Sequence, residues 1–474
     1  MKKKVFTVFL AGIMFFSTTA TGWANAGPSY WSGSNATGAM ITDENCPLTV
    51  KKEVLDFEIS RFPDDFYSDR EVEELKEYSD SFTASYTFYN PTDYNITATL
   101  AFPLGTRPDY LDIEPDFNDS EKYNVKLNGQ NIEKEIRFTR LDSKDEFDFS
   151  KEHSKLTGGY IADEFYHPDM TVTKYILEPV VDFPEGEKYI DVSLMWDSRQ
   201  NTQTAIIPVN FTGYRSYGEN KGEFTAGIMP KEKMILYAIG QPLTDMPEFK
   251  FFGDKGELSG KMNITSSETA LKDYFIALSQ EMNVYKTMSD QDIYNIFLTY
   301  IKKVSGHYGT QRILELGGDV FRGDYLMCWY TYDITVPAGA TVENSVTAPL
   351  WPGIVLNYSP NKYEYSYLLS PAQQWAGFDE IEINIKTPHH ILEINQESFM
   401  QNENGYTYKG SGLPEGELTF TLCAVDNPEK ADNSAYMWLF ALPVLFIIGL
   451  IMFFLVLIGN IGRKNEEKQR KGKQ

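Results

Sequence analysis

The sequence predicts a mainly β exported protein, with two antiparallel β-sandwich-like domains, a helical insertion and one C-terminal transmembrane helix. Two regions of alternating apolar and polar residues, broken by turn clusters, indicate the sandwiches. An amphipathic stretch between them indicates the insertion, and an uncharged apolar run near the C-terminus indicates the span. The 474 residues leave room for two to three domains.

Residues 1–26 have the features of a secretory signal peptide. Three lysines at positions 2–4 precede an apolar core from Val5 to Phe16, and the segment ends with the cleavage site Ala24-Asn25-Ala26. An N-terminal membrane anchor is the alternative, but the apolar core is short for a span. We therefore expect the mature chain to begin at Gly27 and to lie outside the cytoplasm.

The first β domain is expected over residues 27–262. Its clearest unit is a hairpin from Phe82 to Phe102, in which apolar residues alternate on both sides of the turn at Asn90. A second hairpin is expected at Asn128-Gly129, because this dipeptide favours a tight turn between paired strands. Further strands are expected at Ile136–Phe138, Val172–Leu177, Tyr189–Leu194 and Met234–Ile239.

The helical insertion is expected over residues 263–308. Ser266 or Ser267 is placed to cap a first helix, and Ser289 is placed to cap a second. The apolar residues of the second helix, Ile293 to Val304, follow spacings of three and four. We expect this helix to pack on a sheet or between the two β regions; a partner-binding helix is the alternative.

The second β domain is expected over residues 309–426. Tyr363, Tyr365 and Tyr367 fall on one face of an expected strand, which is either buried or a stacking platform for carbohydrate. We expect burial, because aromatic residues are common in strand cores. The other expected strands are Leu326–Val336, Val342–Leu350, Ile381–Ile385 and Leu418–Leu422.

The C-terminal segment predicts a single membrane span. Residues 435–459 are uncharged and would extend about 37 Å as a helix, which is enough to cross a bilayer. A polar linker, residues 427–434, precedes the span, and the tail 460–474 is basic, which marks the cytoplasmic side. No Leu-Pro-x-Thr-Gly sorting signal precedes the span. We therefore expect the helix to anchor an extracellular ectodomain in the cell membrane.

The expected ectodomain is strongly acidic. The chain has a formal charge of −24, and −31 remains when the three lysines of the leader and the net +4 of the tail are left out. This charge disfavours nucleic acid and anionic lipid headgroups as partners and favours cations or basic partners, although solubility alone also accounts for it. One acidic loop offers the oxygen ligands that calcium prefers, with Asp112, Glu114, Asp116, Asn118 and Asp119 as the candidate ligands.

The three cysteines are Cys46, Cys328 and Cys423, which permit at most one internal disulfide. A Cys328–Cys423 bond is preferred because both residues fall in the second expected β domain. Three free thiols are the alternative.

Two groups of short strings resemble a known family. The first is Phe88-Tyr89-Asn90-Pro91-Thr92-Asp93 with Leu100-Ala101-Phe102-Pro103-Leu104, and the second is Tyr365-Ser366-Tyr367-Leu368-Leu369 with Gln374-Trp375-Ala376-Gly377. Both resemble the bacterial exported family known as domain of unknown function 4424. The first is also similar to the start of the vault/inter-alpha-trypsin type sandwich domain. The resemblance implies an exported β-rich protein without an established activity, and it supplies no catalytic residues. The C-terminal span and the acidic N-terminal region depart from the family pattern.

No motif in the chain predicts an enzyme. The histidines lack the H-E-x-x-H spacing of a zinc site, and no G-x-S-x-G elbow, P-loop or dinucleotide fingerprint is present. We expect a membrane-anchored extracellular binding or structural module at the bacterial cell surface, with an envelope glycan or protein as partner. The alternative is a cell-envelope carbohydrate-active enzyme that uses paired carboxylates.

Overall fold

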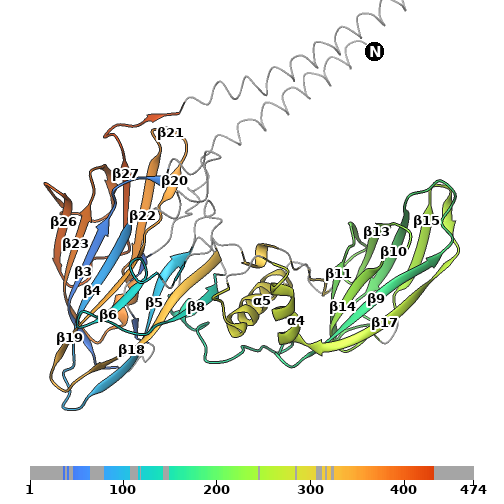
Figure 1. Ribbon diagram of the computed structural model, residues 1–474, viewed down its shortest axis with the longest axis horizontal. Helices are drawn as coiled ribbons and strands as arrows, with labels where there is room; N and C mark the ends of the chain where they lie inside the picture. The colour runs from blue at the N-terminus through green and yellow to red at the C-terminus, as the bar shows by residue number, and fades with distance from the viewer. Residues whose placement is uncertain are drawn as a thin grey trace, which may run out of the picture.

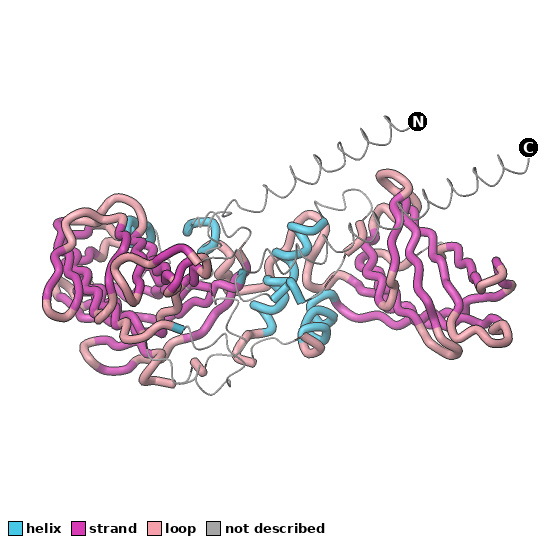
Figure 2. The backbone as a smooth tube through the Cα atoms, turned by 90° about the horizontal axis from the view of Figure 1, so that it is seen from above, coloured by secondary structure: helices cyan, strands magenta, loops and turns pink. Residues whose placement is uncertain are grey.

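Two β-sandwiches lie at opposite ends of the molecule, with helices α4 and α5 between them (Figure 1). The computed structural model describes residues 36–37, 40–41 and 46–431, except 64–79, 107–115, 118, 142–148, 244–245, 283–285, 306–311, 315, 317 and 322–324. Figure 2 shows strands gathered at the two ends and helical turns in the middle. We call the two units the main sandwich and the inserted sandwich.

The main sandwich packs an eight-stranded sheet against two smaller sheets. The large sheet has the order β25-β26-β23-β3-β4-β19-β6-β7. Its strands are β3 (Thr49–Glu58), β4 (Ser81–Tyr89), β6 (Asn124–Leu127), β7 (Gln130–Asn131), β19 (Thr341–Pro349), β23 (Phe378–Lys386), β25 (Met400–Asn402) and β26 (Gly405–Ser411).

The two smaller sheets cover the inner side of the large one. One has the order β1-β22-β27-β24 with β20 on β22, and the other has the order β2-β5-β18-β8. Their strands are β1 (Ala36–Thr37), β20 (Gly353–Val355), β22 (Lys362–Leu368), β24 (His390–Ile394), β27 (Leu418–Cys423), β2 (Met40–Ile41), β5 (Ile96–Thr106), β8 (Glu135–Arg140) and β18 (Leu326–Val336). A two-stranded ribbon, β21 (Tyr358–Ser359) with β28 (Glu429–Lys430), lies at one tip.

Both halves of the chain build the main sandwich. β3 pairs in parallel with β23, β4 pairs with β19, and β5 pairs with β18. The expected division into one domain over 27–262 and another over 309–426 is therefore wrong. The strands of either half alone would leave open edges and an uncovered apolar face, and the two halves supply these to each other.

Residues 81–106 form an arch between two sheets instead of the expected hairpin. β4 lies in the large sheet, whereas β5 pairs with β2 and β18 in a facing sheet. The apolar sides of both strands are buried, as predicted, and the rings of Phe82 and Phe102 stack across the core with centroids 6.1 Å apart. The alternation of apolar residues is the same in a hairpin and in an arch, so it cannot predict which strands pair.

The turn of this arch docks against a second arch, β18–β19. Asn90 is fully buried, and its Nδ2 donates to the carbonyl oxygens of Tyr94 and Val336 at 2.7 and 3.0 Å. The backbone N–H of Asn90 also donates to the carbonyl oxygen of Ala340 at 3.0 Å. One asparagine therefore joins the two crossings between the sheets.

A β-bulge in β3 changes which residues of this strand face the core. The pairing of β3 with β4 shifts register between Val50 and Lys52. After the shift the odd-numbered residues Glu53, Leu55 and Phe57 point inward and are buried. A bulge re-aims the side chains that follow it, and here it turns a carboxyl group into the sandwich interior.

The inserted sandwich consists of residues 171–270 and has its own core. One sheet has the order β11-β14-β9-β17 and the other has the order β12-β13-β10-β15-β16. The strands are β9 (Thr171–Val181), β10 (Ile190–Asp197), β11 (Thr204–Val209), β12 (Gly213–Ser216), β13 (Lys221–Ile228), β14 (Met234–Gly240), β15 (Glu248–Gly253), β16 (Gly256–Leu258) and β17 (Gly260–Ala270). The returning chain touches this sandwich once more, because Ile206 donates to Arg312 and accepts from Leu314, both at 2.9 Å.

The helices connect the two sandwiches. They are α3 (Phe149–His153), α4 (Leu271–Ser279) and α5 (Asp290–Ser305), with the short 3-10 turn η4 (Gly318–Phe321). Another 3-10 turn, η6 (Ser370–Gln374), joins β22 to β23 within the main sandwich. Ser289 caps α5 as predicted, because its Oγ accepts the backbone N–H of Asp292 at 3.1 Å. The expected cap of the first helix at Ser266 or Ser267 is wrong, because β17 continues through both residues to Ala270 and α4 begins at Leu271.

A buried ion pair holds α5 on the main sandwich. The guanidinium of Arg137 in β8 donates to Asp292 at 2.9 Å, and the backbone N–H of Phe138 donates to the same carboxylate at 3.1 Å. Asp292 is almost fully buried. The rings of Phe275 in α4 and Phe297 in α5 stack and join the two helices. The helices therefore lie between the two sandwiches, which is one of the arrangements that the sequence predicted.

Cys328 and Cys423 are both free thiols, so the preferred Cys328–Cys423 disulfide is wrong. Cys328 lies in β18 and Cys423 ends β27, and these strands belong to different sheets. Within the described part of the chain no helix is long and apolar enough to cross a bilayer. The expected leader (1–26), span (435–459) and tail (460–474) lie outside the described residues.

Candidate binding face

The outward side of the sheet β12-β13-β10 in the inserted sandwich carries an ordered group of polar and aromatic side chains. We call it the distal face and define it by Ser193, Met195, Arg215, Tyr217 and Glu223. Arg215 and Met195 are the cross-strand neighbours of Glu223, and Tyr217 follows β12 directly. The strands that carry this face form the end of the molecule remote from the main sandwich (Figure 1).

Strand alternation explains why these residues point outward. Val192, Leu194 and Trp196 of β10 are buried in the core of the inserted sandwich, so Ser193 and Met195 take the opposite side. On β13 Phe224 is buried, which turns Glu223 outward.

Gly222 shows how tightly the edge of this sheet is packed. A Cβ atom at Gly222 would lie 2.5 Å from Cε2 of Tyr214, which packs across it. Tyr214 in turn lies 5.0 Å from the ring of Phe224 between centroids. The glycine therefore lets β12 and Tyr214 close the edge of the sandwich beside the distal face.

The carboxylate of Glu223 is held at both oxygens. Ser193 Oγ donates to its Oε1 at 2.6 Å, and the Tyr217 hydroxyl donates to its Oε2 at 2.7 Å. The guanidinium of Arg215 donates to the Tyr217 hydroxyl at 3.5 Å. The hydrogen bonds from Ser193 and Tyr217, followed by the charges of Arg215 and Lys250, lower the pKa of Glu223, so its negative charge is fixed at neutral pH.

This arrangement suits binding better than proton transfer. A general acid or base needs a pKa near the working pH, whereas the hydrogen bonds of Glu223 keep it ionised. Tyr217 is 48% exposed and lies beside the carboxylate of Glu223 and the exposed guanidinium of Arg215. A second exposed tyrosine, Tyr189, packs beside Gly227 at the other end of the same side of the sheet.

The main sandwich has a shallow depression with three carboxyl groups. It has a volume of about 480 Å³ and contains Glu133, Glu135 and Asp333. Asp333 accepts a hydrogen bond from Thr99 at 2.6 Å. The one aromatic residue beside it, Tyr332, turns its hydroxyl inward to Asn344 at 2.9 Å. The depression therefore offers carboxylates without an aromatic surface on which a sugar ring could stack.

Glu53 is a buried carboxyl group that sequence reasoning missed. The Tyr367 hydroxyl donates to its Oε1 at 3.1 Å and lies 3.2 Å from the Tyr86 hydroxyl, whereas Oε2 accepts no hydrogen bond from the described residues. Burial raises the pKa of Glu53 to about 7, against the opposing effect of the two tyrosine hydroxyls. Alternation counted forward from Val50 would place Glu53 outside, whereas alternation counted back from Leu55 and Phe57, beyond the bulge, places it inside.

The structure decides between burial of the three tyrosines and an exposed platform. Tyr363, Tyr365 and Tyr367 are at most 2% exposed and Trp375 is 6% exposed, so the prediction of burial is confirmed and these rings cannot stack on a carbohydrate. The aromatic residues of the distal face were not singled out from the sequence. The alternating outward residues on both sides of the turn after Tyr217 are the signal that could have found them.

The calcium prediction stays a prediction. Asp112, Glu114 and Asn118 lie outside the described residues, whereas Asp116 and Asp119 form a turn in which Asp119 Oδ1 accepts the backbone N–H of Glu121 at 3.0 Å. Among the residues described, no group of three or more His, Cys, Asp or Glu side chains is arranged to hold a metal ion.

Comparison with known proteins adds one distant likeness. No family model and no curated protein matches the chain, so the resemblance to the domain of unknown function 4424 family stays a prediction. A crystal structure from Legionella pneumophila, provisionally described as a nutrient binding protein, is similar at 10% identity. The match covers 83% of this chain and 71% of that one with a TM-score of 0.32, a level of similarity from which neither fold nor function is transferred.

Proposed function

We propose that the protein is a membrane-anchored extracellular module that binds a glycan of the cell envelope through the distal face. The observation that carries the proposal is the pair of hydrogen bonds that fixes Glu223 between Ser193 and Tyr217, beside an exposed guanidinium. Binding sites place a few preorganised polar groups beside aromatic surface, because ordering them in advance lowers the entropic cost of binding. The apolar side of a sugar ring can lie on Tyr217 while its hydroxyl groups pair with Glu223 and Arg215.

The location is part of the proposal and is supported by the sequence. The apolar run 435–459, the basic tail and the leader are its basis. Protease added to intact protoplasts is expected to remove the ectodomain and spare the tail, and carbonate washing is expected to leave the protein in the membrane fraction. Release by carbonate or a protected ectodomain would contradict this location.

Binding is tested with the full chain in detergent micelles on an array of envelope glycan fragments. A specific signal is expected from the wild type and a much weaker one from Tyr217→Ala. Tyr94→Ala is the matched control, because Tyr94 is 58% exposed on the main sandwich, and it should bind as the wild type does. Equal signals from all three proteins, or none, would contradict glycan binding at the distal face. If the array gives no signal but the full chain captures a specific protein from envelope material in a pull-down, the partner is a protein instead.

A carbohydrate-active enzyme is the second candidate, and the three carboxyl groups of the main-sandwich depression favour it. Its two carboxylates would have to act as acid and as base or nucleophile. The release of reducing sugar ends from the glycan that the array identifies, and its loss in Glu135→Gln, would support the enzyme. Binding without release would leave the binding module as the better account.

A further inference from the structure

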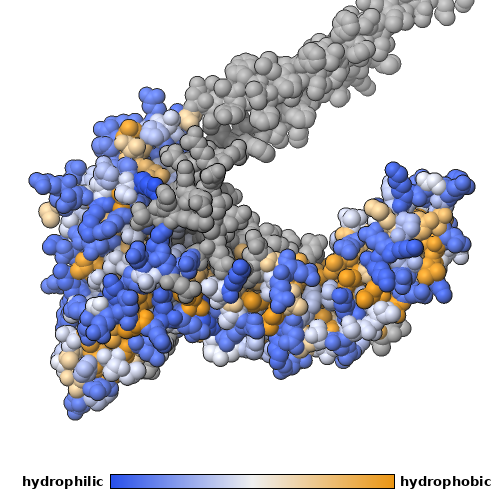
Figure 3. Space-filling model, viewed as in Figure 1, coloured by the Kyte–Doolittle hydropathy of each residue, from blue (hydrophilic) through white to orange (hydrophobic). Residues whose placement is uncertain are grey.

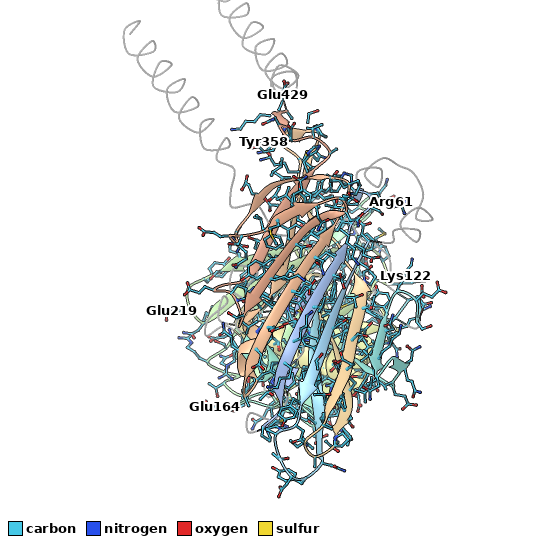
Figure 4. All side chains as sticks on the ribbon, turned by 90° about the vertical axis from the view of Figure 1, so that its left-hand side faces the viewer. Arg61, Lys122, Glu164, Glu219, Tyr358 and Glu429 are labelled. Atoms are coloured by element: carbon cyan, nitrogen blue, oxygen red, sulfur yellow. The ribbon has the colours of Figure 1, made fainter. Side chains whose placement is uncertain are left out.

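The chain leaves the main sandwich at a small exposed tip. β28 pairs with β21, so that Lys430 lies opposite Tyr358, and the backbone N–H of Ala431 donates to the carbonyl oxygen of Asn357 at 2.9 Å. Figure 4 shows Tyr358 and Glu429 at the extreme end of the main sandwich. The sequence predicts a polar linker over residues 427–434. In the structure the described part of this linker, residues 427–431, joins the sandwich through the pairing of β28 with β21.

This tip carries two exposed apolar side chains. Leu356, in the loop between β20 and β21, is 59% exposed, and Val425 is 38% exposed a few residues before β28. The visible surface of the main sandwich is mostly hydrophilic, and hydrophobic residues reach it at this end as well as further down the sandwich (Figure 3). Leu356 thus stays largely exposed although it precedes Asn357, whose carbonyl oxygen accepts the hydrogen bond from Ala431.

The short length of chain between Ala431 and the expected span limits how far the tip can lie from the membrane. Only residues 432–434 separate Ala431 from the start of the expected span at residue 435. Fully extended, the four steps reach at most about 14 Å. The interfacial layer on each side of the hydrocarbon core is about 5 to 8 Å thick. The tip must therefore lie at the membrane surface if residue 435 enters the bilayer.

We propose that the β20–β21 loop is a membrane-contact surface, in which Leu356 inserts into the interface of the bilayer that anchors the chain. The proposal rests on the proposed anchoring and adds a second contact to it. Tyr358 suits the same layer, because its ring is apolar and its hydroxyl stays hydrated. Lys362 holds this ring from the protein side, with its ammonium group 3.9 Å from the ring centroid and 3.7 Å from the carboxylate of Glu393. Two contacts, the span and the loop, would limit the tilt of the main sandwich.

The test uses the full chain in phosphatidylcholine vesicles with an environment-sensitive dye at Leu356→Cys. The matched control carries the dye at Met400→Cys, because Met400 is 63% exposed on β25. The unsubstituted chain gives the labelling blank. The dye at position 356 is expected to shift its emission to the blue and to lose emission when nitroxide-labelled lipid is added, whereas the dye at position 400 should do neither.

Each outcome separates docking from anchoring. If the protein stays with the vesicles in carbonate but the dye at position 356 is not quenched by lipid nitroxide, docking is overturned and anchoring stands. If carbonate releases the protein, both fail. A blue shift that grows with protein density and resists lipid quenching would show that a second copy of the chain covers Leu356, which also overturns the proposal.

Discussion

Phe88 shows how one residue reports on the core of the main sandwich. Its side chain is fully buried, with the ring of Trp375 at 4.7 Å and that of Tyr86 at 5.4 Å between centroids. Phe88→Ala is expected to lower the free energy of unfolding by about 3 to 5 kcal/mol, because the aromatic ring leaves a cavity. Chemical denaturation measures this loss. A loss below about 1 kcal/mol would mean that the site is not a packed core.

Glu53 makes the stability of the main sandwich depend on pH. Its folded pKa of about 7 lies above the ordinary value of 4.5, so the folded state holds the proton more tightly than the unfolded state does. The stabilisation is complete below about pH 4.5 and is lost as the pH rises through about 7. The difference corresponds to about 3 kcal/mol at alkaline pH.

Glu53→Gln tests this pH dependence. The variant is expected to match the wild type near pH 4.5 and to be more stable at pH 8, because the amide cannot ionise. Urea denaturation at the two pH values measures the difference. Glu403→Gln, at an exposed position on the same sandwich, is the control and should leave the pH dependence unchanged. A wild type and a Glu53→Gln variant with parallel pH profiles would show that Glu53 does not titrate in this range.

At the scale of single elements, α5 depends on one buried ion pair. Asp292→Ala is expected to cost about 3 to 5 kcal/mol of unfolding free energy, because the buried Arg137 then keeps only the exposed carboxylate of Glu135, at 3.9 Å, as a counter-charge. The double variant Arg137→Met, Asp292→Leu removes both charges and should recover much of the loss. If the single and double variants are equally unstable, lost packing rather than the ion pair holds the helix.

Local signals predicted the elements better than their partners. The Asn128-Gly129 hairpin is confirmed, because both residues adopt the positive φ angles, 49° and 79°, that this turn requires. The Ser289 cap and the strand limits around Phe82 and Phe102 are local in the same sense. The arch between β4 and β5 was not predictable, because its pairing depends on β18 and β19, more than 200 residues away. The bulge in β3 likewise has no marker such as glycine in the sequence.

Less of the candidate site than of the fold could be predicted from the sequence. Alternation predicted the strand that carries Ser193. The contact of Ser193 and Tyr217 with Glu223, however, depends on the order in which β12, β13 and β10 pair. Aromatic crowding pointed to Tyr363, Tyr365 and Tyr367 instead, and these rings fill the core. Composition locates aromatic residues, whereas the side of the sheet decides whether they are exposed.

For the whole molecule, the pairing of distant strands predicts which fragments fold. Ala270 lies opposite Thr171, so residues 171–270 begin and end at one place and contain both sheets of the inserted sandwich, to whose core Ile313 is added from outside the fragment. This fragment is expected to unfold cooperatively by itself. Residues 309–426 alone should stay unfolded, because β18, β19 and β23 lack their partners β5, β4 and β3. Circular dichroism during thermal melting separates the two cases, and a cooperative melt of 309–426 would contradict the interleaved fold.

The affinity of the distal face for the glycan that the array identifies tests the proposed function most directly. Calorimetry on the wild type and on Glu223→Gln is expected to show an affinity loss of about tenfold or more, because a charged hydrogen bond contributes about 1.5 to 3 kcal/mol. Glu382→Gln is the matched control, since Glu382 is also an outward carboxylate fixed by neighbours, Lys52 and Lys409, but on the main sandwich. Unchanged binding by Glu223→Gln, or an equal loss in both variants, would contradict recognition by the distal face.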